Sequence, residues 1–302
     1  MRYLILLAAA ASLAACQQAA EEPAESAPEP AAAEPAAEPA PTSGDALAAA
    51  LDAQADEAKA RYGARHPRET IEFFEIEPGM TVVEALPGGG WYTKILLPYL
   101  GSDGTLVGAN YAHSIWPLFG FFDQEFIDGM ATWTTDFPVE AEEWRGADSA
   151  SLAAFEFGSM PDDMAGTADR VLLVRAMHNL NRFEGDGGYM TSAIQDTYNV
   201  LKPGGIVGVV QHQAPDDKPH EWADGSRGYL KKDALIEKMT AAGFEFVGES
   251  PVNENPADQP GDDDMVWRLP PTYFGTGEDP EMKAAVDAIG ESNRMTLKFR
   301  KP

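Results

Sequence analysis

Glu84 and three consecutive glycines, Gly88, Gly89 and Gly90, are the residues of this chain best suited to hold a small ligand. Glycine can adopt positive φ angles, and because it lacks a Cβ it lets a ligand lie directly against the backbone. The apolar run before Glu84 predicts a buried strand, so the carboxylate stands at the end of that strand, where open α/β sheets bind their ligands. The spacing therefore indicates a site for a nucleotide-shaped ligand.

The elements around these residues support that interpretation. Residues 81–86 predict a strand, and apolar residues recur at helical spacing within 92–100. A helix that follows a glycine turn offers unpaired N–H groups and partial positive charge at its N-terminus. Taken alone, the glycines leave open the alternative of an ordinary strand-to-helix turn without a ligand.

A second set of residues narrows the choice. Residues 201–212, Leu-Lys-Pro-Gly-Gly-Ile-Val-Gly-Val-Val-Gln-His, predict a helix end, a tight turn and a strand, and residues 170–175 predict another buried strand. At this point the chain resembles the class I S-adenosylmethionine (SAM) methyltransferases. Residues 65–74, 78–93 and 294–302 make it similar, more closely, to a bacterial group of predicted methyltransferases.

The resemblance covers residues 61–302 and implies a Rossmann-like, doubly wound α/β sheet of seven strands, the last of which runs antiparallel. The strands expected from the sequence are 81–86, 105–109, a weak one near 139–144, 170–175, 206–211, 244–249 and 294–299. The expected helices are 92–100, 189–201 and 231–242, with an N-terminal helical cap at 45–61 and 68–74. The alternation of strands and helices by itself indicates only a doubly wound sheet.

The resemblance also implies how the cofactor SAM is held. The backbone of residues 88–90 would lie against the methionine part, and Glu84 would accept from its ammonium group or from a bridging water. The loop departs from the usual Gly-x-Gly-x-Gly pattern, because Leu and Pro occupy positions 86–87. Asn110 stands where the family normally has a carboxylate that accepts both ribose hydroxyls, and an amide makes weaker hydrogen bonds. Asp148 is the candidate for the adenine amino group, with a plain surface aspartate as the alternative.

Methyl transfer from a sulfonium is an in-line displacement, so the protein mainly holds donor and acceptor together and, for an O–H or N–H acceptor, removes a proton. Four histidines are expected just beyond the carboxyl ends of strands: His113, His178, His212 and His220. His178 follows the fourth strand, where the family places residues nearest the methyl group. It is our candidate for the base or the acceptor-positioning group, with Asn179 beside it and His212 as second choice. A structural hydrogen bond is the alternative for each histidine, and Arg175 is a candidate partner for Glu84 or for a substrate carboxylate.

The N-terminus predicts export and lipidation. Residues 1–15 have one basic residue and an apolar core far shorter than the ~20 residues of a spanning helix, which is typical of a signal peptide. Leu-Ala-Ala-Cys16 resembles the lipobox of bacterial lipoproteins, the alternative being a chance cysteine after an ordinary signal. Residues 16–44 are almost entirely Ala, Pro, Glu, Gln and Ser and predict a disordered tether, whereas 45–302 predict one folded domain. Gln17 favours the outer membrane, with the domain facing the periplasm.

The charge of the domain restricts its partners. From residue 45 onward there are 21 Lys and Arg against 43 Asp and Glu. Such a surface repels nucleic acid and anionic lipid, so we expect no nucleic-acid partner and a membrane contact only through the N-terminal lipid. The expected partner is a small-molecule substrate, neutral or cationic, although acidity can also serve solubility alone.

Two aromatic-rich segments, 114–137 and 251–278, interrupt the pattern of strands and helices. They predict local cores beneath long loops, and the functional alternative is a lid that excludes water from an apolar pocket. Residues 258–264 predict an exposed acidic loop, with cation binding as the alternative.

Three functions remain open. The first is a membrane-tethered SAM-dependent methyltransferase that acts on a small molecule. The second is a catalytically inactive methyltransferase-like fold that binds another ligand or an envelope partner, which Asn110 and the cytosolic origin of SAM favour. The third is a metal-dependent hydrolase or oxidoreductase, in which the histidines join Asp216 or Asp217, although the histidine spacing gives it no support.

Overall fold

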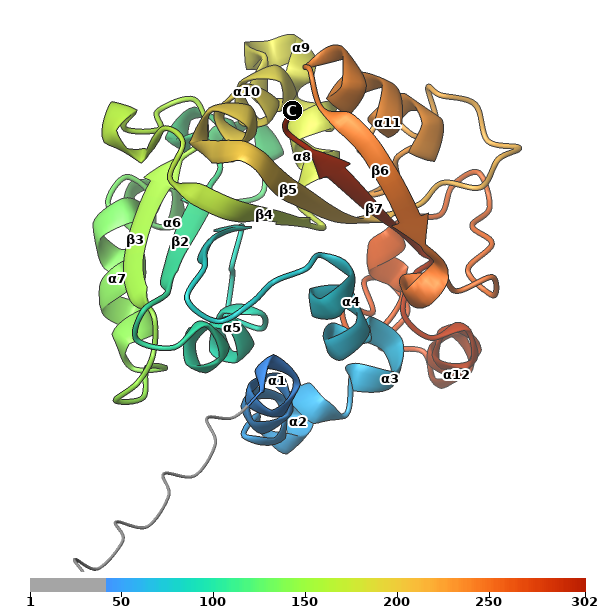
Figure 1. Ribbon diagram of the computed structural model, residues 1–302. Helices are drawn as coiled ribbons and strands as arrows, with labels where there is room; N and C mark the ends of the chain where they lie inside the picture. Colours follow the sequence, from blue (N-terminus) through green and yellow to red (C-terminus); the bar gives the residue numbers. More distant parts are fainter. Residues whose placement is uncertain (1–41) are drawn as a thin grey trace, which may run out of the picture. The chain divides into compact units, whose positions relative to one another are not determined.

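The computed structural model describes residues 42–302, which form a seven-stranded sheet flanked by helices (Figure 1). The strands are β1 (Thr81–Ala85), β2 (Thr105–Asn110), β3 (Ser151–Glu156), β4 (Ala168–Val174), β5 (Leu201–His212), β6 (Glu245–Ser250) and β7 (Arg294–Arg300). Their order across the sheet is β3-β2-β1-β4-β5-β7-β6. β7 pairs antiparallel with both neighbours and the other pairs are parallel, which confirms the predicted fold class.

Helices cover both faces of the sheet (Figure 1). One face carries α1 (Ser43–Asp52), α4 (Pro67–Phe73), α5 (Thr93–Leu100) and α7 (Trp133–Glu142). The other carries α8 (Met177–Arg182), α10 (Tyr189–Val200) and α11 (Lys232–Ala241). The remaining helices are α2 (Asp56–Lys59), α3 (Tyr62–Arg65), α6 (Gln124–Met130), α9 (Glu184–Gly187) and α12 (Pro280–Ile289), with 3₁₀ turns η1 (His113–Phe119), η2 (Asp162–Met164), η3 (Pro251–Asn253) and η4 (Val266–Arg268).

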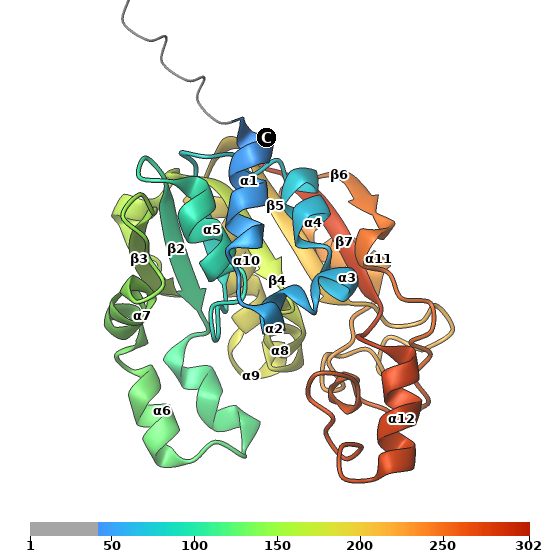
Figure 2. The same cartoon turned by 90° about the horizontal axis from the view of Figure 1, so that it is seen from below.

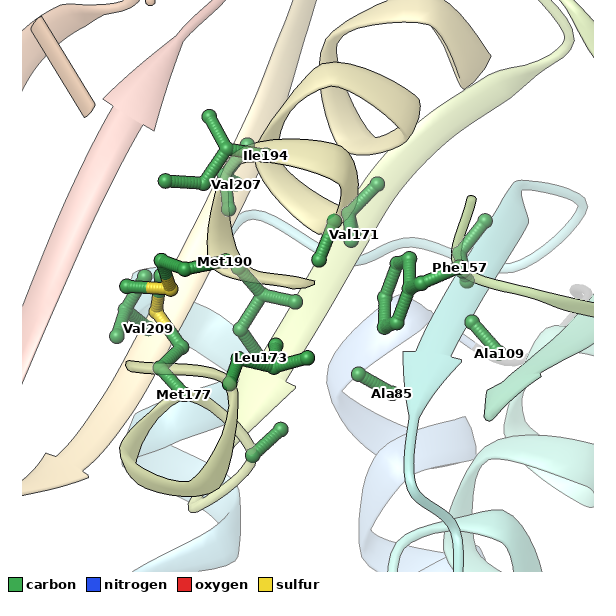
Figure 3. Packing of buried hydrophobic residues seen from close by; sticks show 14 of the residues in the cluster. Ala85, Ala109, Phe157, Val171, Leu173, Met177, Met190, Ile194, Val207 and Val209 are labelled. Carbon is green, nitrogen blue, oxygen red and sulfur yellow. The ribbon is translucent and has the colours of Figure 1, made fainter. Parts of the chain in front are cut away.

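Alternating side chains along each strand build two apolar cores. In β1, Val82 packs on the α1–α5 side, whereas Val83 and Ala85 pack on the α10 side. Figure 3 shows Met190 and Ile194 of α10 lying over apolar residues of β4 and β5. Both faces of the sheet are therefore dry, and polar side chains gather at the strand ends instead.

The third strand is the main error of the sequence interpretation. Residues 139–144 are not a strand: most of them belong to α7, and β3 lies at Ser151–Glu156. Trp133, Phe137 and Ala141 recur at helical spacing, and the Phe137 ring fills the space above Gly108 where a Cβ would clash. The apolar residues of this segment have the spacing of a helix packed on β2, and not the alternation of a strand.

The folded part begins slightly earlier than expected. Thr42 caps α1 in a capping box with Asp45, so Ser43 and Gly44, which we placed in the tether, are helical. The signal peptide, Cys16 and the rest of the tether lie outside the described residues. Across residues 42–302, no helix combines the length and apolar character needed to cross a membrane.

The two ends of the described chain lie at the same edge of the sheet. The Ser43 hydroxyl is 2.9 Å from that of Tyr99, near the end of α5, and the Lys301 amide donates to Gly205, before the buried part of β5. This is the amino edge of the parallel strands, and Figure 2 shows α1 and the C-terminus on that side. α6 and α12 lie on the opposite, carboxyl side, toward which β2 points (Figure 2).

The aromatic segments contain packed clusters as predicted. In the first, the rings of Phe122 and Phe126 stack at 4.2 Å, while Phe121 is 70 % exposed. In the second, Asp258 is buried and pairs with Arg268 at 2.9 Å, which corrects the expectation that residues 258–264 are all exposed. A carboxylate that finds a buried guanidinium partner does not need solvent.

Candidate active site

The glycine loop between β1 and α5 is open on one side. Gly88 and Gly90 have φ of +53° and +77°, angles that favour glycine, and a Cβ placed on Gly89 would meet no atom within 4 Å. Within residues 42–302, the backbone amides of Gly88, Gly89 and Trp91 donate to no protein acceptor. By contrast, the Trp144 ring lies against Gly90 and closes that side of the loop. Free amides beside an open glycine suit a polar or anionic part of a ligand.

Glu84 stands at the end of β1, directly below this loop. Its side chain is buried and accepts a hydrogen bond from the Thr93 hydroxyl at 2.7 Å. Burial raises the pKa of Glu84 to about 7, although the Thr93 contact opposes the shift. No cationic side chain pairs with Glu84 in the described part of the chain, so the expected ion pair with Arg175 is not formed. An uncompensated buried carboxylate of this kind favours a cationic ligand group.

Asn110 and Asp148 lie at opposite edges of the sheet. Asn110 is buried at the end of β2, where its Oδ1 accepts from the Tyr111 amide at 2.8 Å and its Nδ2 lies 3.9 Å from the Met130 sulfur. One of the two acceptor positions of its carbonyl oxygen is therefore occupied, and the amide nitrogen can donate to a ribose oxygen. Asp148 precedes β3 and is exposed near Gly101, at the amino edge of the sheet. Its exposed position is that of the plain surface aspartate which the sequence left as the alternative.

His178 and His212 lie together at the carboxyl ends of β4 and β5. Their ring centroids are 5.7 Å apart, both are buried, and the Trp267 ring covers His178 edge-on. His212 Nδ1 lies 2.6 Å from the Ser292 hydroxyl. Burial, and then Arg175, lower the pKa of His178 to about 4, while burial and the neighbouring His178 lower that of His212. Both imidazoles are thus neutral at pH 7 and suited to hydrogen bonding more than to strong base catalysis.

Asn179 carries an unused acceptor. It lies beside Tyr111, whose hydroxyl donates to the Ala176 carbonyl at 2.6 Å, and its Oδ1 is buried without a hydrogen-bond partner. Buried acceptors are nearly always paired, so this oxygen points to a missing donor. The indole nitrogen of Trp91, directly after the glycine loop, is likewise buried and unpaired.

The other histidines lie elsewhere. His113 Nε2 lies 2.9 Å from the Ile127 carbonyl and joins η1 to α6. His220 is exposed and lines a surface cavity of about 630 Å³ bordered by α10 and α11, to which no residue of the glycine loop contributes. Among residues 42–302, no three His, Asp or Glu side chains are grouped closely enough to hold a metal ion.

The sequence interpretation missed an arginine cluster. Arg175 follows β4 with φ of +55°, in the left-handed region, and shares a small cavity with Arg65 and Arg294. The signal was present, because an antiparallel last strand places its first residue, Arg294, opposite His212 at the carboxyl end of β5. Without the pairing register, nothing showed that these residues converge.

Comparison with solved structures gives matches over most of the chain. Geranyl diphosphate C-methyltransferase from Streptomyces coelicolor A3(2) is 12% identical with a TM-score of 0.49, over 84% of this chain and 88% of its own. The SAM-dependent methyltransferase from Aquifex aeolicus is 10% identical with a TM-score of 0.44, over 85% and 98%. The [4+2]-cyclase SpnF is 15% identical with a TM-score of 0.47, over 87% and 97%.

Sequence comparison adds no closer relative, since no protein-family model and no protein of curated function matches the chain. The assignment of the fold therefore depends on the sheet itself. Its seven strands follow the order that the class I enzymes use, and β7 is the antiparallel strand. The chain has a Rossmann-like, doubly wound α/β fold with the strand order of the class I SAM-dependent methyltransferases.

Proposed function

We propose that this protein is a SAM-dependent methyltransferase that acts on a small molecule. The observation that carries the proposal is the open glycine loop, whose free amides lie next to the buried Glu84 at the end of β1. The backbone of residues 88–90 would bind the methionine part of SAM, and Glu84 would accept from its ammonium group. Asn110 would donate its amide hydrogen to a ribose oxygen.

SAM, when bound, supplies an electrophilic methyl group. The side chains of the protein then have to hold the acceptor in line and keep water out. Asn179 offers its free carbonyl oxygen to an O–H or N–H of the acceptor, and the neutral rings of His178 and His212 can hydrogen-bond to the acceptor nearby. Trp267 covers His178 and excludes water from this region.

Binding of SAM is the direct test. We would titrate the full chain with SAM and with S-adenosylhomocysteine by calorimetry, and compare Gly89→Asp with Gly185→Asp, a surface glycine of α9 that also has free space around it. Saturable heat in the wild type and in Gly185→Asp, lost in Gly89→Asp, is expected. The absence of heat and of any thermal shift with millimolar SAM in the wild type would contradict the proposal.

A second candidate is a methyltransferase-like protein that binds a different ligand without transferring a methyl group. Asn110 favours it, because its oxygen is already bonded to Tyr111 and the Met130 side chain lies beside its amide nitrogen. In that case nucleosides that lack the methionine part would stabilise the protein at least as well as SAM. Thermal shifts with adenosine and with SAM, measured side by side, distinguish the two candidates.

The proposed location is the bacterial cell envelope, with lipid on Cys16 and the domain facing the periplasm. The sequence Leu-Ala-Ala-Cys16 supports it. Membrane fractionation of cells that express the wild type or Cys16→Ser tests it: the wild type should sediment with the outer membrane and the variant should be released. Equal distribution of the two would contradict lipidation at Cys16.

A further inference from the structure

Four arginines gather around a single carboxylate, Glu291, beside the carboxyl end of β4 and the first residue of β7. Arg61, Arg65 and Arg294 all contact Glu291, at 2.6, 3.2 and 3.3 Å respectively. Burial alone would raise the pKa of Glu291, but Arg65, Arg294 and Arg61 together hold it below its usual value. One negative charge therefore serves three guanidinium groups, and a fourth lies beside them.

That fourth guanidinium belongs to Arg175. Within residues 42–302 it makes no ion pair and no side-chain hydrogen bond, although Arg65 and Arg294 line the same cavity. Burial, and next the charge of Arg294, lower the pKa of Arg175 to about 10, so the side chain is still cationic at neutral pH. Arg175 also holds a left-handed backbone angle that a bulky residue adopts at a cost, which is a frequent property of functional positions.

Such a cluster needs a further anion. Arg65 and Arg294 are only 5% and 4% exposed, and buried like charges are costly unless a partner compensates them. Acidic residues are not scarce in this protein, since the chain has 49 of them and a net charge of −27. Among residues 42–302, Glu291 is the one carboxylate that contacts these arginines. The missing negative charge is therefore expected from a ligand.

We propose that Arg175, supported by Arg65 and Arg294, binds a carboxylate or phosphate group of the methyl acceptor. The assignment to the acceptor depends on the proposed methyltransferase function. It follows from position: Arg175 follows β4, and Arg294 pairs with His212 of β5, on the same half of the sheet as the two buried histidines. The glycine loop and Asn110 follow β1 and β2 instead, although Tyr92, just after the loop, lines the same cavity as Arg175.

The proposal replaces the expectation of a neutral or cationic substrate. Net charge acts over the whole surface, whereas recognition depends on the groups that face the ligand. A guanidinium group has a planar fork of donors that matches carboxylate and phosphate oxygens. At the cluster itself, this local attraction outweighs the repulsion of an anion by the acidic surface. The cavity between the arginines has about 10 Å³, close to the smallest that holds a water, so the anion must contact the more exposed Arg175 first.

Inorganic phosphate is the probe for the first experiment. The melting temperature of the full chain would be followed with sodium phosphate and with sodium chloride at matched ionic strength, for the wild type, Arg175→Gln and the control Arg68→Gln, a partly exposed arginine of α4. We expect a saturable increase specific to phosphate in the wild type and in Arg68→Gln, and none in Arg175→Gln. No excess over chloride in the wild type, or an unchanged excess in Arg175→Gln, would overturn the proposal.

Two further readouts separate ligand binding from a structural role. Without phosphate, Arg175→Gln should melt at or above the wild-type temperature, because it removes an uncompensated charge; a structural arginine would give a loss instead. Arg175→Lys keeps the charge but lacks the fork, so it should show a phosphate effect weaker by several-fold. Equal phosphate binding by Arg175→Lys and the wild type would count against recognition by the guanidinium fork.

S-Adenosylhomocysteine distinguishes the acceptor from the donor. Its affinity for Arg175→Gln should stay within about twofold of the wild type, and phosphate should not displace it. Joint loss of both ligands would show that the arginines bind the carboxylate of the donor, and would overturn the assignment to the acceptor. If the wild type binds phosphate through Arg175 but not S-adenosylhomocysteine, the methyltransferase proposal fails while the anion site remains.

Discussion

Glu84 is a buried acid that has no cationic partner among residues 42–302, and this determines how its protonation responds to pH. The folded carboxyl group keeps its proton up to about pH 7, whereas the unfolded one releases it near the ordinary value of 4.5. The stability that Glu84 contributes is therefore present below pH 4.5 and lost as the pH rises through 7. A cationic ligand group at Glu84 would reverse this, because it favours the ionised form.

Replacing Glu84 by Gln tests this directly. The amide keeps the size and can still accept from Thr93, but it has no charge to bury. We expect Glu84→Gln to gain on the order of 2–3 kcal/mol relative to wild type at pH 8, and to lose that gain at pH 5. Urea unfolding at both pH values measures the difference. The same difference at pH 5 and pH 8 would show that burial does not shift this group.

Asp258 makes the opposite case, a buried carboxylate with its partners in place. It accepts from Tyr229 and from the Asn293 amide as well as pairing with Arg268, and its side chain is fully shielded from solvent. Asp258→Ala should cost about 3–5 kcal/mol, because it leaves the buried Arg268 guanidinium with only the longer contact to Asp264, at 3.4 Å, as an ion pair. Asp263→Ala, in the exposed part of the same loop, should cost almost nothing. Urea unfolding that ranks the two variants equally would contradict this assignment.

At the residue scale, sequence reasoning worked where spacing alone places a side chain. Glu84 and Asn110 end adjacent strands, so their shared edge followed from the strand pattern. The neighbours of Arg175 could not be predicted in this way, because Arg65 and Arg294 each lie more than a hundred residues from Arg175 in the sequence. Pairing of β7 with β5 brings them together, and no local pattern reports pairing.

At the scale of elements, the glycine loop has one side that packs against the protein and one side that is open. Gly90 faces the Trp144 ring, whereas Gly89 faces open space. The same substitution at the two positions should therefore have different effects. One glycine serves the packing of α5 against the loop before β3, and the other serves the approach of a ligand.

Alanine at each position separates these duties. Gly90→Ala combines a positive φ with a clash against Trp144 and should lower stability by about 1–3 kcal/mol. Gly89→Ala should leave the melting temperature unchanged and weaken SAM binding, because the added Cβ occupies the approach to the backbone. Thermal melts and calorimetry on both variants check this. Weaker SAM binding with Gly90→Ala alone would reverse the assignment.

Element boundaries show why the third strand escaped prediction. β3 has only one fully buried residue, Phe155, since it is the outer strand of the sheet, and so its apolar signal is weak. α7, by contrast, contains Pro138, which argues locally against a helix interior, yet Phe137 and Ala141 bury against β2 and β3. Tertiary packing outweighed local propensity at both places, and sequence periodicity alone cannot weigh that.

For the whole molecule, charge is the dominant property. The net charge is −27, so the excess acidic side chains repel one another in the folded state, and added salt screens that repulsion. We expect the melting temperature to rise as NaCl increases from about 20 mM to about 500 mM, since the Debye length falls below the spacing of most surface charges. Differential scanning fluorimetry measures it, with KCl as the check on ion identity. A melting temperature that falls with salt would mean that local ion pairs outweigh the global repulsion.

The placement of both chain ends at the amino edge has a practical consequence. A linker joined at Thr42 leaves the molecule on the side away from the glycine loop, the histidines and the arginines. Whether the anchor is a lipid, an affinity tag or a sensor surface, the point of attachment to the domain then lies at the opposite edge of the sheet from the proposed ligand site. Immobilisation through the N-terminus is therefore the natural format for ligand screening, because the attachment does not compete with the molecules being screened.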